Sequence, residues 1–278
     1  MSDAVAMSFK ARMNKLSKEC GLRPQSVIQN YMFERFLQRL AESPYRENFV
    51  IKGGVLISAM VGIRARSTMD VDTTLVDLPL TFKSIRKAFE GMCAIDVGDD
   101  VRLTVQSISR IRLQIEGYGG IRVKLTAEFH GLKVPFSVDV TAGGAVGMIE
   151  YLYPCHFAEN RFLSLKAYSL ETVLAEKCEA ILRRNVVGTR PRDYYDVYLL
   201  TRTNRIDMEA FVSALQTTCE SCGTKSVLDN IEVTLSAIRD SSIQAEYWSR
   251  FQREFPYAKG IFFADAVDAV DELLGELR

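Results

Sequence analysis

The sequence from residue 49 to residue 72 reads FVIKGGVLISAMVGIRARSTMDVD, and this stretch decides the fold. A short apolar run at 49–51 is followed by the glycine pair Gly53 and Gly54, and then by apolar residues at helical spacing over 55–61. Glycine permits the sharp change of direction that such a junction needs. The pattern therefore predicts a strand, a tight turn and a helix.

The carboxylates Asp70 and Asp72 fall in the next predicted strand, 69–75. Side chains two residues apart on a strand point to the same face, so the two should project together. Carboxylates so close repel one another unless a cation lies between them, and Mg²⁺ binds one or two carboxylates together with substrate phosphates. The spacing is typical of a metal–nucleotide site, but also of an ordinary solvated strand end.

Residues close to this pair in the sequence favour the metal–nucleotide interpretation. The candidate nucleotide contacts are Lys52, Gly53, Gly54, Arg66 and Thr68. Glycines let backbone N–H groups approach phosphates, and the helix that follows offers its positive N-terminus. A guanidinium and a hydroxyl just before the aspartates can hold anionic charge. Asp139, in the otherwise apolar run 134–140, is the candidate third metal ligand, because a lone carboxylate is costly to bury unless it is paired or bound to metal.

Hydrophobic periodicity outlines the rest of the chain. It predicts leading helices over 4–42, interrupted at Gly21 and Pro24. Further strands are predicted at 101–108, 111–116, 121–129 and 134–140, and helices at 170–184, 193–201, 208–215, 227–237, 245–253 and 262–277. We therefore expect an α+β protein with a catalytic domain at 1–160, which includes the leading helices, and a helical domain at 161–278 that completes the active site.

Composition excludes a dedicated, globally basic nucleic-acid binder. Lysine plus arginine equals aspartate plus glutamate at 35 each, so an RNA site must be a local patch. Arg183, Arg184, Arg190 and Arg192 are candidates for one, or simply charges that complement helix ends. No stretch approaches the roughly 20 apolar residues of a membrane span, so we expect a cytoplasmic protein with no membrane partner.

The predicted helix 170–184 contains an unexpected lysine. Lys177 follows Leu174 by three residues and precedes Ile181 by four, which puts it on the apolar stripe. Its ammonium either reaches solvent along a buried stem or is held toward nucleotide phosphates. In the next helix Asp193 and Asp196 share a face, either as an acidic first turn or as part of a site.

The order of four motifs resembles the AbiEii/AbiGii toxin family. They are K-G-G at 52–54, R-x-T-x-D-x-D at 66–72, A-E-K-x-x-A at 175–180 and R-D-Y-Y-D at 192–196. The similarity spans about residues 25 to 275. It implies a polymerase-β-like nucleotidyltransferase fold, with a mixed sheet flanked by helices and then a helical C-terminal lobe.

The resemblance also implies site roles. Asp70 and Asp72 match the metal-binding pair, Thr68 the hydroxyl before it, Lys177 the nucleotide-contacting lysine and Asp193 the later catalytic carboxylate. Asp196 closes the D-x-x-D motif, whose aspartates could replace Asp139 as the third acidic residue. The glycine pair lacks the serine that many nucleotidyltransferases have there, so a backbone contact to phosphate is retained and a hydroxyl contact is lost.

The function so implied is Mg²⁺-dependent, with Mn²⁺ as the alternative metal, and uses a nucleoside triphosphate (NTP) as substrate. As in some members of the family, the nucleotide would go to the 3′ end of transfer RNA (tRNA) and block translation, in a toxin–antitoxin or phage-defence system with an antitoxin encoded nearby. The alternatives are transfer to protein, transfer of the terminal phosphate, and a silent nucleotide-binding regulator. The sequence leaves open which NTP is used.

Overall fold

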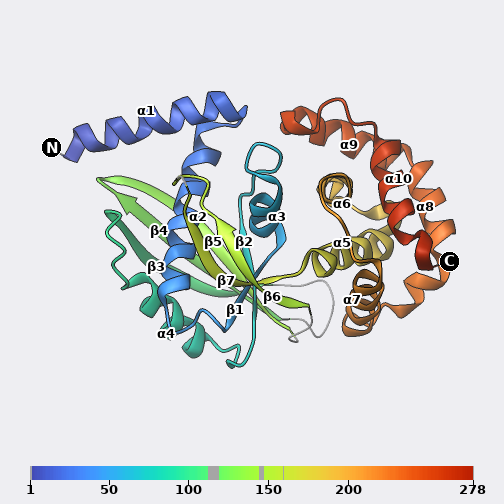
Figure 1. The fold of residues 1–278 in the computed structure, drawn as a ribbon, viewed down its shortest axis with the longest axis horizontal. Helices are drawn as coiled ribbons and strands as arrows, with labels where there is room; N and C mark the ends of the chain where they lie inside the picture. The colour runs from blue at the N-terminus through green and yellow to red at the C-terminus, as the bar shows by residue number, and fades with distance from the viewer. Residues whose placement is uncertain (1, 112–118, 144–146, 159, 278) are drawn as a thin grey trace. The chain divides into compact units, whose positions relative to one another are not determined.

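The computed structural model describes residues 2–111, 119–143, 147–158 and 160–277. The chain divides into two compact units, Met1–Ala167 and Tyr168–Arg278. The sheet belongs to the first unit, and the described part of the second is built of helices (Figure 1). This is the α+β class that the sequence predicts. The predicted division at residue 160 falls before the last strand of the sheet.

A mixed sheet forms the middle of the first unit. Among the described residues it has seven strands in the order β3-β4-β5-β2-β1-β7-β6. Their bounds are β1 Phe49–Lys52, β2 Val71–Leu75, β3 Val101–Ile111, β4 Gly120–Phe129, β5 Leu132–Ala142, β6 Met148–Pro154 and β7 Phe162–Tyr168. β1 is antiparallel to β2 and parallel to β7, and β2 is parallel to β5. β3, β4 and β5 form an antiparallel meander.

Side chains on β4 and β5 alternate between a buried face and an open face. Phe136 of β5 lies on the buried face, and its ring contacts those of Phe33 and Phe36 on α2 (Pro24–Glu42). Phe89 of α4 (Phe82–Cys93) stacks on Phe36, with ring centroids 5.7 Å apart. Helices α2 and α4 therefore cover the apolar face of the meander, and the side chains of its polar face are exposed or half-buried.

Helix α2 is buried along most of its length, polar residues included. Glu34 accepts a hydrogen bond from the backbone N–H of His156 at 2.6 Å. Arg39 donates to both carboxylate oxygens of Asp99, at 2.8 and 2.9 Å. Buried polar groups need such partners. The helix therefore holds two loops of the first unit in place, besides packing on the sheet.

Several elements differ from the sequence-based expectations. The leading helices are confirmed as α1 (Ser2–Cys20) and α2, and the strand–turn–helix as β1 followed directly by α3 (Gly53–Val61). Helix α4 and strands β6 and β7 have no counterpart among the predictions. β6 is an edge strand without regular alternation of burial, so the period-2 signal is weak there. The strand predicted at 111–116 lies, from residue 112 on, outside the described residues.

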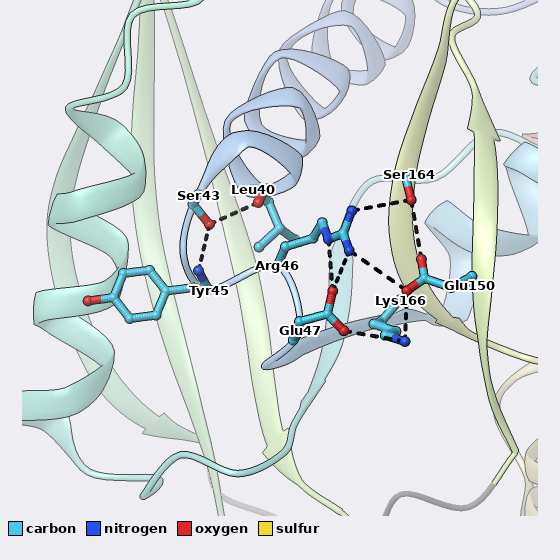
Figure 2. A network of polar contacts seen from close by, with 8 residues as sticks. All are labelled: Leu40, Ser43, Tyr45, Arg46, Glu47, Glu150, Ser164 and Lys166. Atoms are coloured by element: carbon cyan, nitrogen blue, oxygen red, sulfur yellow. Dashed lines mark hydrogen bonds and ion pairs between the residues drawn. The ribbon is translucent and has the colours of Figure 1, made fainter.

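The turn that joins α2 to β1 is tied to the outer strands by a surface network (Figure 2). Arg46 pairs with Glu47 at 2.6 Å, and Lys166 of β7 pairs with Glu150 of β6 at 2.8 Å and with Glu47 at 3.3 Å. Ser164 donates to Glu150 at 3.2 Å. Exposed ion pairs are individually weak. The network fixes the approach of the chain into β1 more than it adds stability.

The described part of the second unit contains six α-helices joined by short turns, several of them 3₁₀ turns. They are α5 Leu170–Arg184, α6 Pro191–Thr203, α7 Met208–Ser221, α8 Ile231–Arg239, α9 Ser242–Glu254 and α10 Phe263–Leu274. Ser169 caps α5 by accepting from the backbone N–H of Thr172 at 3.2 Å. Helix α5 packs against α6 and α7, which fixes the side chains that α5 and α6 present to each other.

Candidate functional site

The junction of β1 and α3 depends on a glycine without a side chain. Gly53 has φ of +62°, in the left-handed region that favours glycine. A Cβ atom at Gly53 would overlap the carboxylate oxygen Oδ2 of Asp72 on β2. The predicted turn is therefore a place where the backbone at the start of α3 lies directly against Asp72.

The second glycine of the pair lies against the segment before β2. A Cβ at Gly54 would stand 2.5 Å from Thr68 Oγ1 and 3.0 Å from a guanidinium nitrogen of Arg66. Both side chains are buried. Thr68 Oγ1 donates to the carbonyl oxygen of Asp70 at 3.0 Å and lies 3.4 Å from its backbone N–H. Thr68 thus shapes the turn that leads into Asp70, a role that the motif alone did not indicate.

Two α2 residues that the sequence analysis did not single out hold this same segment. Asn30 donates to the carbonyl oxygen of Thr68 at 3.0 Å, and Gln29 donates to that of Met69 at 3.0 Å. Both amides are buried. The helical pattern of the sequence did not indicate these contacts, because the role of a buried amide can be recognised only when the segment that it binds has been placed. They are positioning residues for Asp70.

A row of charged residues crosses four strands in register. Lys52 on β1 is opposite Asp72 on β2, Asp72 is opposite Asp139 on β5, and Asp139 is opposite Arg122 on β4. Residues paired in this way share one face of the sheet. Asp70 immediately precedes β2 and is exposed, while Asp72 is half-buried within it. The sheet thus brings together the residues predicted from three separate segments.

Arg122 is the main addition to the predicted site. Its Nε and Nη2 atoms donate to the two oxygens of Asp139, each at 2.7 Å, in a bidentate pair. Hydrogen bonding to Asp139 raises the pKa of Arg122, and the charges of Asp70 and Asp72 raise it further. Arg122 is therefore within electrostatic reach of all three carboxylates. Asp139 is paired with a fixed cation, and this pairing already offsets the cost of placing a carboxylate in an otherwise apolar strand.

The donor set in the first unit fits a hard divalent cation. Asp70 and Asp72 offer oxygen ligands, and Mg²⁺ is commonly held by one or two carboxylates with phosphates and water completing the shell. Among the described residues, no group of three or more histidine, cysteine, aspartate or glutamate side chains is arranged to hold a metal by itself. The fit is to a metal that arrives with a phosphate ligand, and Asp139 as a third ligand stays a prediction.

Lys177, Asp193 and Asp196 form a second cluster within the helical unit. The Lys177 ammonium lies 2.6 Å from Asp193 Oδ1 and 2.9 Å from Asp196 Oδ2. Its side chain is 12% exposed, and those of the two aspartates are 4% and 0% exposed. Lys177 therefore does not snorkel to solvent. Its position on the apolar stripe is explained by two buried carboxylates on α6.

Two arginines complete this second cluster. Arg184 lies 2.9 Å and Arg190 3.6 Å from Asp193 Oδ2. Burial raises the pKa of Asp193, but Lys177 and Arg190 outweigh burial and bring that pKa below its usual value. Both arginines line a small pocket beside Asp193 together with Gly188 and Tyr194. Asp193 is thus ionised, hydrogen-bonded and flanked by cations.

We expect Gly53→Ala to destabilise the protein more than Gly21→Ala. Both glycines have positive φ, +62° and +67°, which costs an alanine about 1 to 2 kcal/mol, but only Gly53 faces an obstacle, since nothing lies near a Cβ at Gly21. Urea unfolding measures the difference. Asp72→Ala should recover part of the Gly53→Ala loss by removing the overlapping oxygen. Equal losses at the two glycines would contradict the close approach.

We expect Lys177→Met to lower the free energy of unfolding by about 3 kcal/mol at pH 7, because it removes the ammonium that two buried carboxylates share. The pKa of Asp193 is lowered in the folded protein, so the pair's contribution is present above about pH 4 and is lost as pH falls through that lowered pKa. The loss should therefore shrink in acid.

Lys225→Met is the matched control for Lys177→Met, because Lys225 makes an exposed ion pair with Glu220. Its effect in the same urea unfolding series should be small at every pH. Losses of the same size in the two variants would show that the Lys177 cluster is no more than a surface pair.

Comparison with known proteins adds an identification to this geometry. A family model described as the nucleotidyl transferase AbiEii toxin of a type IV toxin–antitoxin (TA) system matches residues 35–275. Solved structures that match include an H. pylori protein provisionally described as a nucleotidyltransferase, with 12% identity, TM-score 0.49 and coverage of 92% of this chain and 96% of that one.

Another structural match is JHP933 from Helicobacter pylori, with 13% identity, TM-score 0.48 and coverage of 92% of this chain and 94% of that one. Neither structural likeness is close enough to carry an argument about function. No curated protein matches the sequence. In the part of the chain that the structure describes, no helix is long and apolar enough to cross a membrane. The extent of the family match is decisive, and the chain belongs to the AbiEii family of nucleotidyltransferase toxins.

Proposed function

We propose that this nucleotidyltransferase moves a nucleoside monophosphate from an NTP to RNA, with the 3′ end of tRNA as the acceptor. The observation that carries the proposal is the row of Lys52, Asp72, Asp139 and Arg122, with Gly53 directly against Asp72. Family membership supplies the reaction class. The RNA acceptor rests on the resemblance and on the charges described below.

Asp70 and Asp72 are the residues that would hold Mg²⁺, or Mn²⁺ in its place. When bound, the metal supplies charge neutralisation at the phosphates and orients them for in-line displacement. Lys52 is paired in register with Asp72 on the neighbouring strand, and its ammonium can contact a phosphate oxygen of the nucleotide that the metal holds. The start of α3, at Gly53 and Gly54, offers backbone N–H groups and the positive end of the helix.

The supporting residues keep these groups in position before substrate binds. Thr68, held by Asn30, fixes the backbone of the turn at Asp70, so that its carboxylate projects from a fixed point. Buried Arg66 lies against Gly54 and gives this corner a fixed positive charge. Arg122 pairs with Asp139 and adds positive charge beside the three carboxylates, which screens their mutual repulsion. Positioning and electrostatics of this kind account for most of the catalysis in phosphoryl transfer.

Lys177 and Asp193 keep the roles that the resemblance implies, contact with the nucleotide and contact with the acceptor hydroxyl, and Asp196 supports them as a nucleotide-site residue. The geometry of the helical unit refines these roles. The lowered pKa of Asp193 makes it a weak base but a lasting hydrogen-bond acceptor. Asp193 would therefore act mainly by orienting the attacking hydroxyl, and less as the general base that accepts its proton.

A labelling experiment tests the proposal. The protein is incubated with Mg²⁺, total tRNA and each NTP labelled at the α-phosphate, and labelled tRNA is the expected product. Asp72→Asn keeps the shape of the side chain and removes its charge. If the ionised carboxylate contributes about 3 kcal/mol to transition-state stabilisation, the variant should be slower by on the order of 100-fold. Asp77→Asn is the matched control, because Asp77 is exposed beyond the end of β2.

Other outcomes of this experiment have definite meanings. Label from the γ-phosphate and none from the α-phosphate would identify a phosphotransferase. Labelled protein in a cell extract, with tRNA unlabelled, would identify a protein-modifying enzyme. Absence of label in every acceptor, with NTP still bound, would identify a silent regulator. Each of these results would overturn the proposal.

The toxin assignment of the family fits this activity, because blocking tRNA acceptor ends would arrest translation. We propose accordingly that an antitoxin is encoded beside this chain. Growth arrest that depends on Asp72 would support toxicity. Normal growth at high expression, with the antitoxin absent, would count against it.

A further inference from the structure

The open face of the β3–β5 meander is unusually polar for a sheet surface. Side chains of β3, β4 and β5 that point away from α2 and α4 are mostly charged or carry hydroxyls, with an isoleucine and a proline as the exceptions. They are Arg102, Thr104, Ser107, Ser109, Ile111, Arg122, Lys124, Thr126, Glu128, Lys133, Pro135, Ser137, Asp139 and Thr141. We call this set the open meander face.

Positive charge exceeds negative charge on the open meander face. Arg102 pairs with Glu128 at 2.9 Å, and Arg122 pairs with Asp139. Each of the face's two carboxylates is thus matched by an arginine. Lys124 and Lys133 remain as the surplus charge, and both are exposed. Lys133 adds only a longer-range interaction with Glu128.

The open meander face is continuous with the catalytic row. Arg122 and Asp139 belong to both, because they pair in register on β4 and β5. Lys124 is two residues from Arg122 on the same face of β4, and Ser107 and Ser137 flank it on the neighbouring strands. From Asp139 to Lys133 the strand extends for about 20 Å at roughly 3.3 Å per residue. A ligand lying along the face would have one end at the carboxylates.

We infer that the open meander face binds the phosphate backbone of the RNA acceptor and leads its 3′ end to Asp70 and Asp72. The inference rests on the proposed function for the placement of that end. Lysines, arginines and hydroxyls are the groups that contact phosphate and sugar in nucleic-acid complexes. A protein partner is disfavoured, since protein interfaces have an apolar core. Among the described residues of this face, Ile111 at the end of β3 is the one large aliphatic side chain.

The experiment compares two doubly substituted full-length proteins. Lys124→Gln with Lys133→Gln removes the surplus charge from the open meander face. Lys83→Gln with Lys87→Gln removes the same charge from exposed positions on α4, which packs on the other face of the sheet. None of the four lysines is part of the catalytic row. Binding of 5′-labelled tRNA is measured by fluorescence anisotropy at salt concentrations from about 50 to about 200 mM, a range over which contacts to phosphate weaken strongly.

The expected result is a rise of on the order of 10-fold in the Kd for tRNA in the Lys124/Lys133 variant, with a salt slope smaller by about 1 to 2. The KM for tRNA in the labelling assay should rise with it, while the KM for NTP stays unchanged. The Lys83/Lys87 variant should match the wild type in every respect.

Failure of the inference and failure of the proposed function give different results. Unchanged tRNA binding in the Lys124/Lys133 variant, with nucleotide transfer intact, would overturn the inference alone. If tRNA binding is weakened in that variant but the wild type transfers no nucleotide, the inferred RNA-binding face would be supported and the proposed nucleotide transfer would be overturned. Absence of tRNA binding by the wild type would also overturn the inference. So would a Lys124/Lys133 variant that loses affinity for an acidic protein while its affinity for tRNA is unchanged.

Discussion

The contact between the Gly53 backbone and the Asp72 carboxylate is the constraint on which the site depends. β1 must deliver the chain to the start of α3 within a side chain's reach of β2, and only a residue without Cβ fits there. Once that approach is made, the β1–β2 register is fixed, and Lys52 is opposite Asp72. The parallel pairing of β2 with β5 then brings in Asp139, and β4 adds Arg122. The site is a consequence of strand register.

Charge balance gives the two clusters different chemical characters. In the first unit, Asp139 is paired with Arg122, while Asp70 and Asp72 stand near Lys52 and Arg66 and offer carboxylate oxygens to a metal. In the helical unit, Asp193 and Asp196 stand with Lys177, Arg184 and Arg190, which leaves positive charge in excess. The first cluster offers oxygen ligands for a cation, and the second offers positive charge for an anion.

The sequence was most informative where chemistry and local geometry coincide. The glycine pair, the aspartate pair and the lysine on an apolar stripe could all be recognised from spacing, because each breaks a local rule that an ordinary strand or helix obeys. The order of the motifs then predicted the family, and the family model confirms it. The residue roles were not established in this way, and they stay proposals.

Other parts of the site could not be predicted because they depend on distant pairing. Arg122 is only an alternating polar residue on β4 until β5 places Asp139 opposite it. Asn30 is only a polar residue on α2 until the turn before Asp70 packs against it. The edge strand β6 lacked the alternation that reveals a strand. Pairing of this kind is long-range information, and a local pattern does not contain it.

The most direct test of the central claim is to locate the metal. A crystal of the full chain with Mn²⁺ and a non-hydrolysable NTP would show the metal by its anomalous scattering. We expect it on the carboxylates of Asp70 and Asp72, with phosphate oxygens in its shell and Asp139 as the candidate third protein ligand. A metal bound away from Asp72, or nucleotide bound with no metal at this pair, would contradict the account.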